Sequence, residues 1–154
     1  MKKRIAILIA FFIATLAYSQ SAQVITEILD SDQVTFGQVC YLSAVQQGFV
    51  GENASYSDAI EILYQKGQIP VRLYDGSVVP LVNLSYIYAQ MWNIKGGLFY
   101  RIFHGAPRYA YKQMKADGIF PDYADPGLVI SGTEALNIYT ACSMKYGNMQ
   151  LSVE

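Results

Sequence analysis

The sequence predicts an all-α fold of three helix-turn-helix units around a central three-helix core, with the first unit truncated. A helix over 57–66 that stops at Gly67 recurs over 107–117 with its stop at Gly118, 51 residues later. Each stop is followed by an extended piece ending in proline and then by a turn. The helix after each turn has a single apolar stripe, which is typical of a helix packed on one side. Repetition at a fixed period indicates a repeat architecture.

The composition allows one globular domain of ordinary size. The chain has 154 residues, of which 53% are hydrophobic and 15% are charged, and its formal net charge is −1. These values exclude a disordered polar tail, a collagen-like fibre and a highly charged nucleic-acid binder. A chain of this length has enough apolar side chains for a core.

Residues 1–19 have the pattern of a secretory signal peptide. Met1-Lys-Lys-Arg4 is cationic, and the run Ile5–Ala17 is apolar except for Thr15. This run is shorter than the roughly 20 residues with which a helix crosses a bilayer. We expect cleavage after Ser19, with the bond after Ala22 as second choice and an uncleaved membrane anchor as the alternative. The expected location is the periplasm or the surface of a bacterial cell.

Removal of the signal peptide changes the charge of the chain. It takes away three of the 11 basic residues and leaves eight against 12 acidic ones, a net charge of −4. Binding to a phosphate backbone requires many cationic contacts, so we expect no nucleic-acid partner. No later segment is apolar enough to predict a membrane span.

The remaining chain, 20–154, is expected to form one repeat domain. Its leading unit covers about 24–50 and has a short first helix near 25–29. The middle unit covers 51–97, and Ser57 or Asp58 is expected to cap its first helix.

The last unit covers 98–147, and Pro107 suits the first turn of its first helix. The second helices of the middle and last units align without gaps at 79–87 and 130–138, and a third copy lies at 34–42. Equivalent positions of the three copies are expected to meet at the centre: Val39, Leu84 and Ala135, with Leu42, Ile87 and Ile138.

The last unit resembles the S-layer homology family. Lys115-Ala-Asp-Gly-Ile119 is similar to the family's helix ending in Gly-Ile-Ile, and Ile130-Ser-Gly-Thr-Glu-Ala-Leu136 is similar to its second helix opening Ile-Thr-Arg-Ala-Glu. Typically three such units make a pseudo-threefold bundle with grooves between its lobes. The resemblance covers most of the chain after the signal peptide and implies this bundle.

The resemblance also assigns capping roles. Ser131 stands at the family's threonine, where a hydroxyl caps the helix, and Glu134 stands at the glutamate that completes a capping box. Thr35 and Gln38 fill the same two roles in the leading copy. The middle copy has Asn83 at the glutamate position and is a poorer match.

The family's motif arginine is absent from all three copies. Its positions hold Phe36, Leu81 and Gly132. In the family this cation helps to hold an anionic cell-wall polymer, and none of the replacements supplies paired donors or a fixed charge. The departure weakens the implied wall anchoring but leaves the implied fold.

A basic and aromatic segment between Asp75 and Asp117 is the best candidate for a binding site, because it contains no acidic residue. Aromatic faces beside cations suit acidic sugars or a carboxylate-rich protein partner. The alternative is that the aromatic side chains belong to the core and the cations to a solvated face. The predicted binding residues are Trp92, Arg101, His104, Arg108, Tyr109 and Lys112.

Two cysteines, Cys40 and Cys142, leave two alternatives. In an oxidising compartment they can form a disulfide, and otherwise they are two buried thiols that act as small hydrophobic side chains. The segment Asp122–Gly127 departs from a calcium loop and is better explained as a turn. We expect no metal and no cofactor.

No catalytic constellation stands out. The one histidine has no partner at an informative spacing, and no nucleophile elbow or phosphate-binding glycine loop is present. We therefore expect a non-enzymatic envelope module that binds a partner protein or scaffold outside the cytoplasm. The alternatives are a module that binds cell-wall glycan, either peptidoglycan or a secondary polymer, and a small envelope hydrolase.

Overall fold

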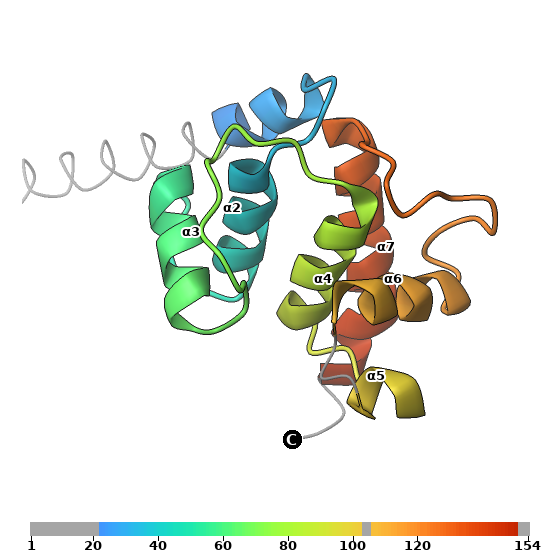
Figure 1. The fold of residues 1–154 in the computed structure, drawn as a ribbon. Helices are drawn as coiled ribbons and strands as arrows, with labels where there is room; N and C mark the ends of the chain where they lie inside the picture. The colour runs from blue at the N-terminus through green and yellow to red at the C-terminus, as the bar shows by residue number, and fades with distance from the viewer. Residues whose placement is uncertain (1–21, 103–105, 151–154) are drawn as a thin grey trace, which may run out of the picture.

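The protein is described by a computed structural model that covers residues 22–102 and 106–150 (Figure 1). Within these ranges the fold is mainly helical, which confirms the predicted all-α class, and β pairing is limited to isolated bridges. Residues 22–29 are also helical. The labelled helices are α2 (Phe36–Gln46), α3 (Tyr56–Gln65), α4 (Leu81–Met91), α5 (Leu98–Ile102), α6 (Pro107–Ala116) and α7 (Gly132–Gln150). The predicted signal peptide and His104 lie outside the described residues.

The helix positions follow the spacing seen in the sequence. Helices α3 and α6 both have ten residues, and their starts lie 51 positions apart, as do the starts of α4 and α7. Gly67 and Gly118 follow α3 and α6 with φ angles of 69° and 78°. This left-handed conformation is accessible to glycine without strain, so both helices stop where the sequence predicts.

The caps are partly as expected. Thr35 and Gln38 form a complete capping box at the start of α2. The Ser131 hydroxyl accepts a hydrogen bond from the backbone N–H of Glu134, whose carboxylate accepts one from the Ser131 N–H at 2.9 Å. Asn83 is exposed, and α4 begins after a proline without a side-chain cap.

The predicted cap of α3, Ser57 or Asp58, was wrong by two or three residues. Ser55 is the N-cap, and Asp58 is its capping-box partner three residues later. Hydrogen bonds from Ser55 lower the pKa of the Asp58 carboxyl below its usual value. A hydroxyl at 55 with a carboxylate at 58 satisfies two free backbone donors, which neither Ser57 nor Asp58 as cap would achieve.

The second helices meet in the interior. Val39, Leu84 and Ala135 are fully buried, Leu42 and Ile87 are buried, and Ile138 is only half-buried at the edge. Helices α2 and α4 pack against each other, and α3 and α6 cover their outer sides (Figure 1). The buried Tyr88 of α4 donates a hydrogen bond to the Ala135 carbonyl of α7 at 3.3 Å.

Each of α2, α4 and α7 begins against the backbone of a segment that is distant in the sequence. Its first N–H groups lack partners inside the helix and donate to a loop carbonyl instead. The three such hydrogen bonds are Phe36 N to Ser77 O (2.7 Å), Leu81 N to Leu128 O (2.8 Å) and Gly132 N to Ser31 O (2.9 Å). The start of α2 is thus joined to the loop before α4, the start of α4 to the loop before α7, and the start of α7 to the segment before α2.

Short backbone pairings reinforce this closed arrangement. Val34 donates to the Ile130 carbonyl at 2.8 Å, and Val79 donates to the Val34 carbonyl at 3.1 Å. The segment 22–31 bridges the starts of α2 and α7 at the top of the molecule (Figure 1). Contacts between residues that are far apart in the sequence therefore fix where the loops between helices lie.

Candidate functional site

Trp92 is a core residue, so its predicted role in binding was wrong. It is 5% exposed at the end of α4, and its ring centroid lies 6.0 Å from that of Tyr139 on α7. Within the described residues, its indole N–H has no hydrogen-bond partner. The apolar stripe of α4 continues into Trp92, and packing against α7 buries the ring.

The predicted cations do reach the surface. Arg108 and Lys112 are exposed one turn apart on α6, and the Lys112 ammonium lies 5.8 Å from the ring centroid of Tyr109, which is half-buried. Arg101 is exposed on α5, a short helix that packs against α6. The structure therefore brings together three of the predicted residues on α6 with Arg101 nearby.

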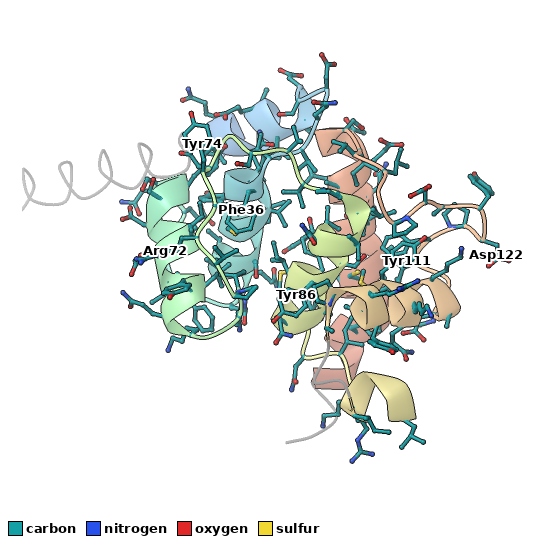
Figure 2. The ribbon with its side chains drawn as sticks, in the orientation of Figure 1. Phe36, Arg72, Tyr74, Tyr86, Tyr111 and Asp122 are labelled. Carbon is teal, nitrogen blue, oxygen red and sulfur yellow. The ribbon has the colours of Figure 1, made fainter. Side chains whose placement is uncertain are left out.

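Other aromatic side chains of this segment are structural. Tyr111 stacks on Phe120 with ring centroids 5.5 Å apart, and its hydroxyl donates to the Ala124 carbonyl at 2.5 Å. Figure 2 shows Tyr111 on the side of α6 that faces the 117–131 loop. These contacts hold the 117–131 loop, so Tyr111 belongs to the core, as Trp92 does.

A groove on the opposite side of the molecule was not predicted. It has a volume of about 310 Å³ and is lined by Ser57, Ile60 and Glu61 of α3 and by residues 72–75. We call it the Tyr74 groove, because the Tyr74 side chain is 78% exposed at its edge. Figure 2 shows Tyr74 and Arg72 beside α3, far from Tyr111 and Asp122.

Polar contacts order one wall of the Tyr74 groove. The Arg72 guanidinium lies 2.8 Å from a Glu61 carboxylate oxygen and stacks over Tyr64, 4.6 Å from its ring centroid. The hydrogen bond from Arg72 lowers the pKa of the Glu61 carboxyl. The ion pair between Arg72 and Glu61 is exposed to solvent, so it contributes little to stability. It does fix the position of the long Arg72 side chain.

The 72–75 segment is held by the backbone of α2. Gly37 N donates to the Asp75 carbonyl at 2.8 Å. A Cβ atom at Gly37 would lie 2.8 Å from the Tyr56 Cβ and 2.9 Å from the Asp75 Cβ, so a glycine is required for this close approach. The groove is therefore preformed by contacts among α2, α3 and the loop.

The sequence did carry a signal for this groove. Val71, Leu73 and Tyr74 place large apolar side chains in a stretch between a proline and a glycine, where loop residues are commonly polar, and all three are exposed. Exposed apolar side chains that cluster indicate an interaction surface more often than scattered ones do.

Charge is unevenly distributed along the described chain. Residues 22–78 contain seven carboxylates and two cations, a net charge of −5, whereas 79–150 contain four carboxylates and six cations, a net of +2. The Tyr74 groove lies in the acidic part, and the exposed cations of α6 lie in the basic part. The two surfaces therefore suit ligands of opposite charge.

The three positions at which the resemblance to the S-layer homology family would place an arginine are all buried. Phe36 and Leu81 are core residues, and Leu81 is 2% exposed. Gly132 is buried against the leading unit, where a Cβ atom would lie 1.6 Å from the Ile28 carbonyl oxygen. These positions pack inside the molecule, so they are not available to a ligand.

The two cysteines are free thiols in the structure, and the disulfide alternative is not adopted. Cys40 on α2 and Cys142 on α7 are fully buried, and burial raises the pKa of each thiol to about 12. They pack as small hydrophobic side chains, which was the other alternative.

The segment 122–127 forms a turn. Gly127 N donates to the Asp125 carboxylate at 2.6 Å, which is an Asx-type contact. In the described part of the chain, no three His, Cys, Asp or Glu side chains are grouped as metal ligands would be. Over the same residues, no helix combines the length and apolar character needed to span a bilayer.

Comparison of the chain with protein-family models, with curated proteins and with solved structures finds no match.

Proposed function

We propose that this protein is a non-enzymatic, exported module of the bacterial cell envelope that binds a partner protein or scaffold outside the cytoplasm. The observation that carries the proposal is the contrast between the buried motif-arginine positions and the exposed Tyr74 groove. The first removes the charged contact with which the S-layer homology family holds a wall polymer. The second offers an aromatic and apolar surface of the kind enriched in protein interfaces.

We propose that the chain is a degenerate member of the S-layer homology family, with units at about 24–50, 51–97 and 98–147. The 51-residue spacing of α3 and α6 and of α4 and α7, together with the cyclic hydrogen bonds at the three helix starts, supports this relationship. Within this proposal, the loops between units hold the helix starts together inside the molecule. The Tyr74 groove on the outer surface of the middle unit is then the binding surface.

Binding of a cell-wall glycan is the second candidate function. Arg108, Lys112 and the ring of Tyr109 on α6, with Arg101 nearby, favour it because they place cations beside an aromatic face. The third alternative, a small envelope hydrolase, depends on His104, which lies outside the described residues.

Sedimentation with purified cell walls distinguishes the first two candidates. We expect the purified protein to stay in the supernatant at physiological salt, because the family's charged contacts are missing. The matched control is the double variant Arg101→Ala and Arg108→Ala, which should behave like the unchanged protein. Strong sedimentation that this double variant abolishes would favour glycan binding and contradict the proposal.

A further inference from the structure

The Tyr74 groove has features that specify the chemistry of its occupant. This inference rests on the proposed function and deepens it by naming the kind of partner segment. We propose that the groove receives a segment of a partner protein that carries a lysine or arginine beside an apolar side chain.

The apolar part of the occupant follows from the shape of the groove. Ile60 is buried beneath it, and Leu73 and Tyr74 expose apolar surface along its edge. Because hydrogen bonds of the 75–77 backbone to α2 hold the loop, little ordering is required when a ligand binds. A preformed apolar surface of this size can take one or two side chains and lose little conformational entropy.

The cationic part follows from the charges. Glu61 already has a cationic partner in Arg72. Asp75 lines the same groove, one carboxylate oxygen accepts the Gly76 N–H at 2.8 Å, and no cation lies within ion-pair distance in the part of the chain described. The other carboxylate oxygen and the exposed face of Tyr74 can therefore serve an incoming ammonium or guanidinium group.

The net charge around the Tyr74 groove also favours a cationic partner segment. The groove lies in the acidic part of the chain, whose net charge of −5 attracts a cationic segment and repels an acidic one. A second copy of this chain could also present cations, from α6. We assign the groove to a different protein, in line with the proposed function, and the test below includes self-association as an outcome, because Arg101 of α5 lies beside the exposed Ile102.

Selection from a random peptide library displayed on phage tests this proposal with a defined probe. The purified protein is the bait, and the variants Tyr74→Ser and Asp75→Asn are compared with it. Asparagine keeps the side-chain oxygen that accepts the Gly76 N–H and removes the charge. Tyr123→Ser is the matched control, since Tyr123 is 89% exposed in the corresponding loop of the last unit.

The expected result is enrichment of peptides with lysine or arginine next to an aromatic or aliphatic residue. Their affinity should fall at least about tenfold with Tyr74→Ser, fall with Asp75→Asn, weaken with salt and be unchanged with Tyr123→Ser. Circular dichroism establishes that each variant is folded. If Tyr74→Ser does not fold, Asp75→Asn and the salt dependence decide the result.

Three results would overturn the proposal: enrichment of acidic peptides, enrichment or affinity that does not depend on Tyr74 and Asp75, and self-association of the protein that Tyr74→Ser abolishes. The first two leave the proposed function standing if the protein still fails to sediment with cell walls and is cross-linked to another protein in the envelope. Sedimentation with walls through Arg101 and Arg108 would remove the proposed function itself.

Discussion

Gly132→Ala is expected to lower the free energy of unfolding by at least about 3 kcal/mol, at the upper end of the cost of overpacking. The added Cβ atom would lie 1.6 Å from the Ile28 carbonyl oxygen, which is backbone and cannot rotate away. The segment 22–31 would have to move, and the hydrogen bond from Gly132 N to Ser31 O would be lost. Thermal unfolding should shift down by about 10 °C for a domain of this size.

Gly147→Ala is the matched control because it lies in the same helix. A Cβ atom there would meet Trp92 at 3.7 Å and Ser143 at 3.8 Å, which are ordinary contacts. Alanine restricts the unfolded chain and favours helix, so this variant should gain about 0.5–1 kcal/mol. Equal stabilities of the two variants would show that residues 22–31 do not close the arrangement against α7.

Leu81→Arg, which places an arginine where the S-layer homology motif has one, is expected to destabilise the protein by about 3–5 kcal/mol, as uncompensated buried charges do. Leu81 is 2% exposed, and its backbone N–H is fixed to the Leu128 carbonyl. A charged side chain at this position has no described carboxylate partner among the contacts of the helix start, so the protein must open locally to hydrate it.

Asn83→Arg controls for the added charge. Asn83 is exposed two positions further along α4, and a surface substitution there should change stability by no more than about 0.5 kcal/mol. Chemical denaturation measures the free energy of unfolding of both variants. Equal m-values show that the difference lies in stability and not in the compactness of either state. If Leu81→Arg were as stable as Asn83→Arg, the motif-arginine positions would be accessible and the case against wall anchoring would fail.

Local chemistry allowed much of the fold to be predicted. Gly67 and Gly118 end their helices because glycine adopts the left-handed conformation there without strain. Thr35 with Gln38 and Ser131 with Glu134 cap their helices across three residues. These interactions are complete within one turn of chain, so the sequence contains all of their determinants.

Packing between distant segments was harder to predict. The sequence left Trp92 open as either a binding residue beside cations or a core residue, and the approach of α7 buries it against Tyr139. Gly132 looked like a lost arginine, but its lack of a side chain is required by Ile28, about a hundred positions earlier. Nothing in the local sequence of either residue specifies these neighbours.

The two candidate binding surfaces also differ in whether the local sequence could predict them. The cations of α6 were found because charge is nearly always exposed, and Arg108 and Lys112 are. The Tyr74 groove was missed because its lining comes from α3 and from a loop whose position depends on Gly37 of α2. The groove exists only when three segments meet.

The most direct test of the proposed function is photo-cross-linking in the native envelope, followed by mass spectrometry. A photo-reactive residue replaces Tyr74 in one version of the protein and Tyr123 in another. We predict adducts with peptides of another protein, with a higher yield from position 74 than from position 123. Adducts that contain wall sugars and no foreign peptide, from either position, would contradict the proposal that this module binds a protein.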